Sequence, residues 1–233
     1  MKISNNYQLI KRNKKISQIV LYTALALLVI GLIWSFTGAD ITQYTMAYLI
    51  LIPAYILVQV SIYLANKWGR SPRPDEIIEQ SLKGLNDQYT LYNYNTGVSH
   101  LIVGPAGIWI IKPYHQFGTI TFNPKNNQYE QKGGANFIAK LFGQEGLSNI
   151  ERESKMALRD FEIFIKKMNI NSELIPKIVN IFYSEKAEIL SKNAPEATIH
   201  SDKLKDMLRS QAKINPVRDE KINQIRRQLP DPN

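Results

Sequence analysis

Two long apolar runs stand out against the mixed pattern of the rest of the chain. The first extends from Ile19 to Phe36 and the second from Met46 to Ala65, and neither contains a charged residue. At about 1.5 Å per residue, each run covers roughly 27 to 30 Å, which matches the hydrocarbon core of a bilayer. We therefore predict two transmembrane helices, at about 18–36 and 46–65, within a helical hairpin that occupies 17–66.

A cleaved signal peptide is the competing interpretation of the first run, because basic residues precede it. However, the run is longer than the usual signal core of roughly 7 to 15 apolar residues, and a second run follows at once. We favour an uncleaved hairpin.

After the hairpin, short apolar runs alternate with amphipathic segments, which is typical of an α/β domain. The pattern predicts a domain over 74–215, after a short linker at 67–73 and before a charged helix and polar tail at 216–233. The expected helices lie at about 75–85, 148–168 and 202–210; the expected strands lie at about 89–94, 99–103, 108–112, 119–122, 178–182 and 198–200, with a short edge strand near Tyr129. Because Pro113 lacks a backbone donor, we expect regular pairing of its strand to stop near Lys112.

The basic residues lie mainly beside the apolar runs. The net charge is +9, yet the chain from Pro74 onward holds 21 basic and 19 acidic residues, so the domain is nearly neutral and has no global nucleic-acid footprint. The positive-inside rule then predicts a multi-pass cell-membrane protein of bacterial inner-membrane type, with a basic cytoplasmic N-terminus at 1–16 and both termini cytoplasmic. The basic flanks are either a topology signal only or also contacts to anionic membrane lipid.

Small residues recur at every seventh position of both runs: Ser17, Ala24, Gly31 and Gly38 in the first, and Ala47, Ala54 and Ser61 in the second. A seven-residue repeat keeps one face of a helix toward its partner, and small side chains allow close approach in lipid. We predict that the helices pack through these faces, within the hairpin or in a homo-oligomer. A chance recurrence is the alternative, because small residues are common in membrane spans.

The segment from Val98 to Gly118 carries the most specific pattern in the domain. Two apolar strands flank the turn Gly104-Pro105-Ala106-Gly107, which predicts a buried β-hairpin. The pattern resembles the nuclease-related (NERD) domain, a branch of the PD-(D/E)xK restriction-endonuclease-like superfamily. The resemblance extends over roughly 74–211, and its further matches are Glu76, Leu82 and Leu85 in an opening helix, Gly118 and Ile120 after the hairpin, and a closing strand and helix at 178–183 and 202–210.

The resemblance implies a mixed sheet flanked by helices, but it also implies a lost active site. Aligned on the turn, Ser99 occupies the position of the family's catalytic Asp, Lys112 that of its Glu, and Tyr114 that of its Lys. Family-type cleavage needs two carboxylates to hold a divalent cation. An ammonium in place of one would repel each unit of the ion's charge by about 4 kcal/mol at 4 Å. We therefore expect no metal, no cofactor and no hydrolysis.

With hydrolysis excluded by this pattern, we expect the domain to function in binding. A pocket of Ser99, His100, Lys112 and Tyr114, together with Glu76, would accept a phosphate, a nucleic-acid backbone or an acidic protein partner, as expected of a membrane-anchored binding or scaffolding module.

Two alternatives stay open. The first is a metal-dependent nuclease with migrated carboxylates, for which Glu76, Glu79 and Glu130 are candidates. The second is a membrane-assembly protein that acts through its spans. The chain has no cysteine, which excludes disulfides and thiolate metal sites.

Overall fold

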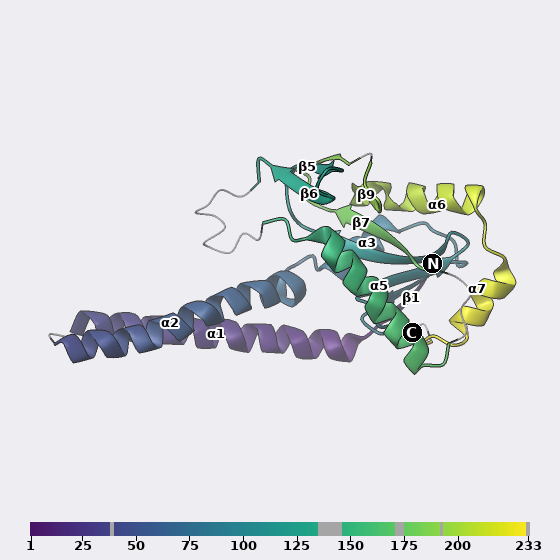
Figure 1. Cartoon of the computed structure of the whole chain (residues 1–233). Helices are drawn as coiled ribbons and strands as arrows, with labels where there is room; N and C mark the ends of the chain where they lie inside the picture. The colour runs from purple at the N-terminus through teal and green to yellow at the C-terminus, as the bar shows by residue number, and fades with distance from the viewer. Residues whose placement is uncertain (38–39, 135–145, 171–174, 192, 232–233) are drawn as a thin grey trace. The chain divides into compact units, whose positions relative to one another are not determined.

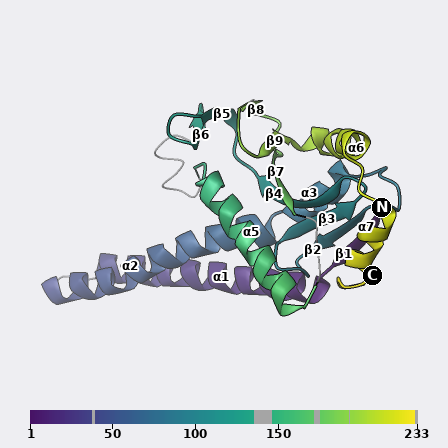
Figure 2. The same cartoon turned by 45° about the vertical axis from the view of Figure 1, so that its right-hand side comes forward.

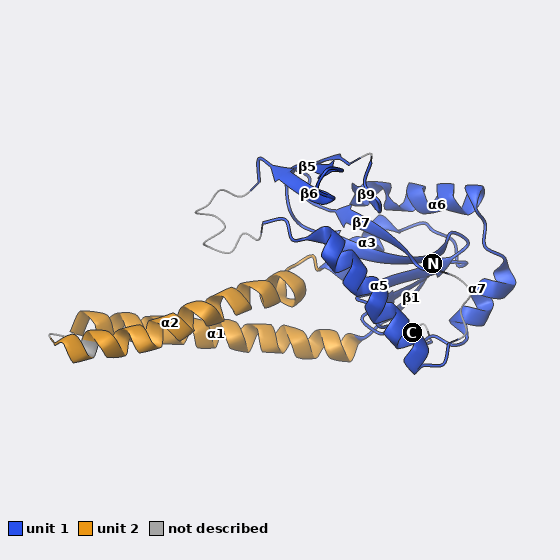
Figure 3. Cartoon of the chain, viewed as in Figure 1, with its two compact units in different colours: residues 1–6, 74–233 blue, residues 7–73 orange. Residues whose placement is uncertain are grey.

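The computed structural model describes residues 1–37, 40–134, 146–170, 175–191 and 193–231. The chain divides into two compact units, and the first unit is discontinuous in sequence (Figure 3). One unit combines Met1–Asn6 with Pro74–Asn233, and the other is Tyr7–Arg73. Gly38, predicted to lie in the helix contact, is outside the described residues.

The second unit is a helical hairpin of α1 (Tyr7–Thr37) and α2 (Ile41–Leu64), followed by a π-helical turn, η1 (Ala65–Gly69) (Figure 1). Both helices are long and apolar enough to cross a membrane. Most of their large apolar side chains are exposed on the unit itself, as expected of surfaces that lipid would cover. The first helix begins well before the predicted span, because the basic residues that precede the apolar run continue the same helix.

The small residues of the seven-residue repeat that the structure describes are all buried in the hairpin. Ser17, Ala24 and Gly31 are buried along α1, and Ala47, Ala54 and Ser61 along α2. A side chain added at Gly31 would place its Cβ 2.7 Å from Leu51 Cδ2, which is too close for any real contact. The two backbones therefore approach each other where the sequence provides the smallest side chains.

A six-stranded mixed sheet forms the centre of the first unit, in the order β1-β2-β3-β4-β7-β9. Its strands are β1 (Lys2–Asn5), β2 (Thr90–Asn93), β3 (His100–Gly104), β4 (Gly107–Tyr114), β7 (Lys177–Phe182) and β9 (Ala197–His200). Strands β2, β3 and β4 form an antiparallel meander, whereas β7 and β9 continue from β4 in parallel. Strand β1 pairs in parallel with β2, so residues that precede the hairpin form the edge of the sheet.

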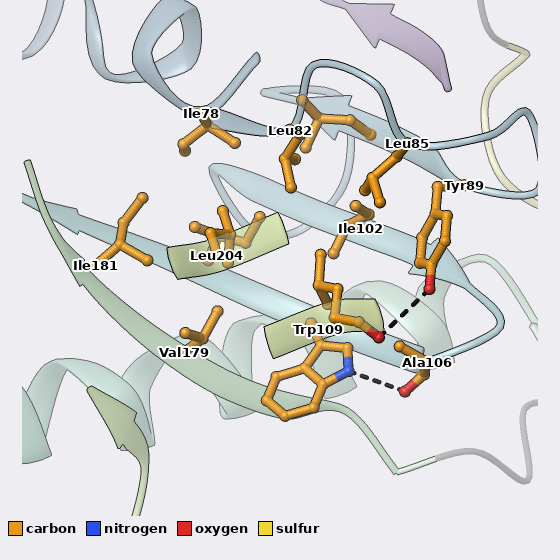
Figure 4. Close-up of a cluster of buried hydrophobic side chains, with 13 residues drawn as sticks. Ile78, Leu82, Leu85, Tyr89, Ile102, Ala106, Trp109, Val179, Ile181 and Leu204 are labelled. Atoms are coloured by element: carbon orange, nitrogen blue, oxygen red, sulfur yellow. Dashed lines mark hydrogen bonds between the residues drawn. The ribbon is translucent and has the colours of Figure 1, made fainter. Parts of the chain in front are cut away.

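Helices cover both faces of this sheet (Figures 1 and 2). On one face, α3 (Pro74–Ser81) and α6 (Leu204–Ile214), which follows a 3₁₀ turn η2 (Ser201–Lys203), enclose the apolar cluster shown in Figure 4. The indole of Trp109 lies in this cluster and donates to the Ala106 carbonyl of the hairpin turn at 2.9 Å. The near-continuous apolar runs predicted to be buried strands are thus covered on both sides.

On the other face, α5 (Ile150–Lys167) and α7 (Asp219–Arg226) pack against the alternate side chains of the same strands. A separate three-stranded sheet of β5 (Gly118–Asn123), β6 (Gln128–Lys132) and β8 (Ala187–Leu190) packs near the start of α5. The sequence predicted β5 and β6 but neither β8 nor the separation into a second sheet.

Two sequence expectations need correction. The first six residues are part of the domain rather than of a separate N-terminal tail, because β1 pairs along its whole length with β2. Strand β4 does not stop at Lys112 but pairs with β7 as far as Tyr114. The Tyr114 carbonyl accepts from the Tyr183 amide, directly after β7, so the backbone nitrogen of Pro113 faces the β3 side. The pairing of β4 with β3 extends only to Ile110, so the missing donor of Pro113 costs no ladder bond.

Candidate functional site

Three parallel strands place polar side chains in one row on the face that α5 covers. In the register of β4, β7 and β9, Lys112 lies opposite Asn180, and Asn180 opposite Thr198. Tyr114 is two residues beyond Lys112 on the same strand and so points to the same face. Polar groups therefore gather near the carboxyl ends of these strands, within an otherwise apolar face.

Helix α5 adds a carboxylate to this row. Glu153 Oε2 lies 3.2 Å from Lys112 Nζ and accepts a hydrogen bond from the Tyr114 hydroxyl at 3.0 Å. Both charged side chains are partly exposed, Lys112 by 26% and Glu153 by 35%. We call the five residues Lys112, Tyr114, Glu153, Asn180 and Thr198 the Lys112 cluster.

The electrostatics of the cluster favour a charged pair beside a neutral phenol. Burial would raise the pKa of Glu153, but the Lys112 charge and hydrogen bonds from neighbouring side chains outweigh it and lower that pKa. Burial and, after it, the Glu153 charge raise the pKa of Tyr114. At neutral pH the carboxylate is therefore ionised, and the phenol keeps its proton and acts as a donor.

The interior of the cluster has unused hydrogen-bonding capacity. The side chain of Asn180 is fully buried, and neither its amide oxygen nor its nitrogen has a hydrogen-bond partner of full geometry among the described residues. The Tyr129 phenol makes a weak hydrogen-bond contact with the Asn180 side chain, short of full geometry, and shares a regular hydrogen bond of 2.7 Å with Thr198 Oγ1. Buried amides are rarely left in this state, so Asn180 marks a place where a polar ligand atom or water would be stabilised.

His100, predicted to share the pocket, belongs to the opposite face of the sheet. Its Nδ1 lies 2.8 Å from Asn93 Oδ1, and the Asn93 amide nitrogen donates to Asn5 Oδ1 at 2.8 Å and to Glu79 Oε1 at 3.0 Å. The Asn5 amide also donates to Glu79 Oε1, at 2.9 Å. We call these four residues the Asn93 network; it joins β1, β2, β3 and α3, and each of the four side chains is hydrogen-bonded within it.

The remaining predicted residues are dispersed. Ser99 is half-buried just before β3, and its carbonyl accepts from the Tyr94 amide at 2.8 Å. Glu76 lies on α3, the helix of the Asn93 network, while Glu130 lies on β6 of the smaller sheet and accepts from Asn123 at 2.7 Å. The structure thus brings together Lys112 and Tyr114 but separates both from His100.

Glu153 and Asn180 are the members of the site that sequence reasoning missed. Glu153 lies three residues after Ile150 and four before Ala157, both buried, so helical spacing alone marks it as an acid beside the buried stripe. Asn180 interrupts the apolar run of β7 and could have been identified as a polar residue within a predicted buried strand. Their proximity to Lys112 required the strand register and the path of α5.

These features define an α/β protein with a mixed sheet, joined to an apolar helical hairpin. Searches against protein-family models, curated proteins and solved structures give no match to the chain.

Proposed function

We propose that the chain is a membrane-anchored, restriction-endonuclease-like domain that binds a ligand at the Lys112 cluster and does not hydrolyse it. The fold assignment is supported by the positions of its elements. An opening helix, the β3–β4 hairpin, a glycine at the start of β5, and a closing strand and helix occur in the order that the NERD resemblance implies. In this assignment the polar cluster occupies the place of the former nuclease site.

The observation that carries the proposal is the contact between Lys112 and Glu153. Under the NERD resemblance, Lys112 takes the position of a catalytic carboxylate. The Glu153 carboxylate, 3.2 Å from Lys112 Nζ, neutralises the charge of this lysine. Among the residues that the structure describes, no group of three or more acidic, histidine or cysteine side chains is arranged to hold a metal ion. Binding through a lysine, a phenol and a buried amide is the chemistry that this arrangement supports.

The Glu153 carboxylate of the cluster controls the access of a ligand to Lys112. An anionic group of a ligand competes with Glu153 for Lys112, and the Tyr114 hydroxyl and the Asn180 amide offer it further hydrogen bonds. We propose a phosphodiester backbone or an acidic side chain of a partner as the group that binds.

The proposed membrane anchoring is supported by the apolar hairpin and by the path of the chain. The first unit contains residues on both sides of the hairpin, so two spanning helices would return the chain to the side from which it came. The basic residues beside the apolar runs favour the cytoplasmic side for this unit.

The test uses the full chain in detergent, because a fragment without residues 2–5 would lack an edge strand of the sheet. DNA and RNA oligonucleotides are incubated with it, with and without Mg²⁺ or Mn²⁺, and both binding and cleavage are measured. We expect no cleavage, weaker oligonucleotide binding for Lys112→Gln and tighter binding for Glu153→Gln. Glu162→Gln, an exposed change on the same helix, serves as the matched control.

Metal-dependent cutting that Glu153→Gln abolishes would overturn the proposal in favour of a nuclease with a displaced carboxylate. If neither Lys112→Gln nor Glu153→Gln alters oligonucleotide binding, the cluster is not a nucleic-acid site. The same variants are then measured against an oligoglutamate peptide, and an unchanged affinity there would also refute binding of acidic partners.

A further inference from the structure

A second polar site lies at the opposite edge of the sheet, away from the Lys112 cluster. A cavity of about 280 Å³ opens between α7 and the β1–β2 edge. Figure 2 shows α7 beside β1, near both ends of the chain. The cavity is lined by Lys2, Thr90, Tyr92, Asn223, Arg226, Arg227 and Asp231.

The strand register builds the floor of this cavity. Lys2 on β1 lies directly opposite Thr90 on β2, so their side chains share a face, and Tyr92 is on that face two residues further along. Helix α7 lies over the same face, where its apolar side contributes Ile222 and Ile225 to the core. Residues far apart in sequence thus meet in one preformed site.

Positive charge exceeds negative charge around the cavity. Lys2, Arg226 and Arg227 line it together with a single carboxylate, that of Asp231. Within the described ranges, none of these three basic side chains forms an ion pair within 4 Å. Burial lowers the pKa of Arg226, as expected for a cation whose charge is desolvated without full compensation.

Two fully buried polar atoms of the lining residues have no hydrogen-bond partner of full geometry in the part of the chain that the structure describes. They are the Thr90 hydroxyl and Nε of Arg226. Burial raises the pKa of the Tyr92 phenol to about 12, although a weak hydrogen-bond contact with the Thr90 side chain acts to lower it, so the phenol keeps its proton. This contact does not have full hydrogen-bond geometry at the Thr90 hydroxyl. Buried polar groups without partners indicate a missing ligand or water.

The guanidinium of Arg226 is held in a fixed orientation. Its Nη2 donates to the Val103 carbonyl at 3.2 Å and to the Gln88 carbonyl. These contacts tie α7 to β3 and to the start of β2. Because both contacts use Nη2, they hold the guanidinium in place, while its Nε has no hydrogen-bond partner among the described residues and remains as a donor for an oxyanion.

We propose that this cavity binds a phosphate group through Arg226, Arg227, Lys2 and the Thr90 hydroxyl. Phosphate oxygens accept from arginine, ammonium and hydroxyl donors at once, and a dianion would balance the excess of cations. The cavity is slightly smaller than a typical small-molecule pocket, so it fits a phosphate with a short substituent and not a large ligand. The site is independent of the function proposed for the Lys112 cluster.

The phosphate has two chemical sources that the structure treats alike: a soluble phosphomonoester or the headgroup of an anionic lipid. Strand β1, which carries Lys2, continues within two residues into the apolar hairpin. The test therefore needs a soluble arm and a lipid arm.

In the soluble arm, inorganic phosphate and glycerol phosphate are titrated into the full chain in phosphatidylcholine nanodiscs, and binding is followed by calorimetry. In the lipid arm, the unfolding temperature is compared between nanodiscs with and without phosphatidic acid. We expect saturable phosphate binding in the soluble arm, and a rise in unfolding temperature with phosphatidic acid if the lipid is the source.

The double variant Lys2→Gln with Arg227→Gln removes two exposed cations and spares the half-buried Arg226. It should weaken phosphate binding, or reduce the lipid effect, by about tenfold or more. The matched control, Lys186→Gln with Lys213→Gln, removes the same charge from exposed positions outside the cavity and should change neither. No saturable response in either arm, or an equal loss in the control, would overturn the proposal.

Discussion

The two faces of the central sheet differ in how fully their buried polar side chains are hydrogen-bonded. On the α3 face, the Asn93 network pairs each amide with the carboxylate of Glu79 or with a neighbouring side chain. On the α5 face, Lys112 and Glu153 are partly exposed, and the Asn180 amide is buried without a full partner. A saturated polar network fixes strand positions, whereas an unsaturated one has capacity left for a ligand. The contrast assigns structure to one face and binding to the other.

The largest effect on stability is expected from the removal of residues 2–5, which deletes β1 and takes Asn5 out of the Asn93 network. The loss of a paired edge strand and of its buried hydrogen bonds should destabilise the first unit by about 4 kcal/mol. The unfolding temperature should fall by roughly 10 °C. Calorimetry with limited proteolysis measures both, and Lys11→Gln with Lys14→Gln is the control, because it changes only exposed charges on α1. Unchanged protease resistance would show that β1 contributes little.

A second test replaces one buried asparagine on each face with leucine, which has a similar volume. Asn93→Leu removes one hydrogen bond from each of Glu79, Asn5 and His100 and should cost about 3 kcal/mol. Asn180→Leu removes an amide that has no full partner, so stability should change by less than about 1 kcal/mol in either direction. Thermal unfolding of the two variants gives the comparison directly. Equal losses would mean that the two faces do not differ as described.

A smaller effect is expected from the pH dependence of the Lys112 cluster. Because the folded-state pKa of Glu153 lies below its ordinary value of 4.5, its contribution to stability is present above that value and is lost as the pH falls through the folded pKa. The partly exposed pair should contribute less than about 1 kcal/mol. Wild type should therefore exceed Glu153→Gln in unfolding temperature at neutral pH, and the difference should disappear in acid. A difference that grows as the pH falls would contradict this assignment.

The smallest effect on stability is expected from a substitution of Ser154, which follows Glu153 of the Lys112 cluster on α5. Its side chain is fully buried, and its hydroxyl has no hydrogen-bond partner among the described residues. Ser154→Ala should therefore leave stability unchanged or raise it by up to about 1 kcal/mol, because it removes an unsatisfied polar group. A clear loss on thermal unfolding would show that a bound ligand or water uses the hydroxyl.

Much of the fold could be predicted because apolar periodicity is a local signal. The hairpin strands β3 and β4, the buried strand β7 and helix α5 all follow runs or spacings that burial imposes. Strand β1 was missed because its four residues contain one large apolar side chain, and its stability comes from pairing with β2. No local sequence pattern predicts that β1 pairs with a strand so distant in the sequence.

The site was predicted in part for the same reason. Lys112 and Tyr114 were placed together correctly because they are two residues apart on one strand. His100 was grouped with them although alternation along β3 and the hairpin register put it on the other face. Glu153 reaches Lys112 because α5 packs against the sheet, and no fixed spacing in the sequence predicts that contact.

The parallel pairing of β1 with β2 also sets the order in which the protein can be made. The ribosome synthesises the first strand, then the whole of residues 7–73, and only then the strand that β1 pairs with. During that interval Lys2–Asn5 has no sheet to join and Asn5 no amide to bind. Strand β1 therefore stays an unpaired, aggregation-prone segment until the whole hairpin and then β2 have been synthesised. The domain cannot close this edge of its sheet any earlier during translation.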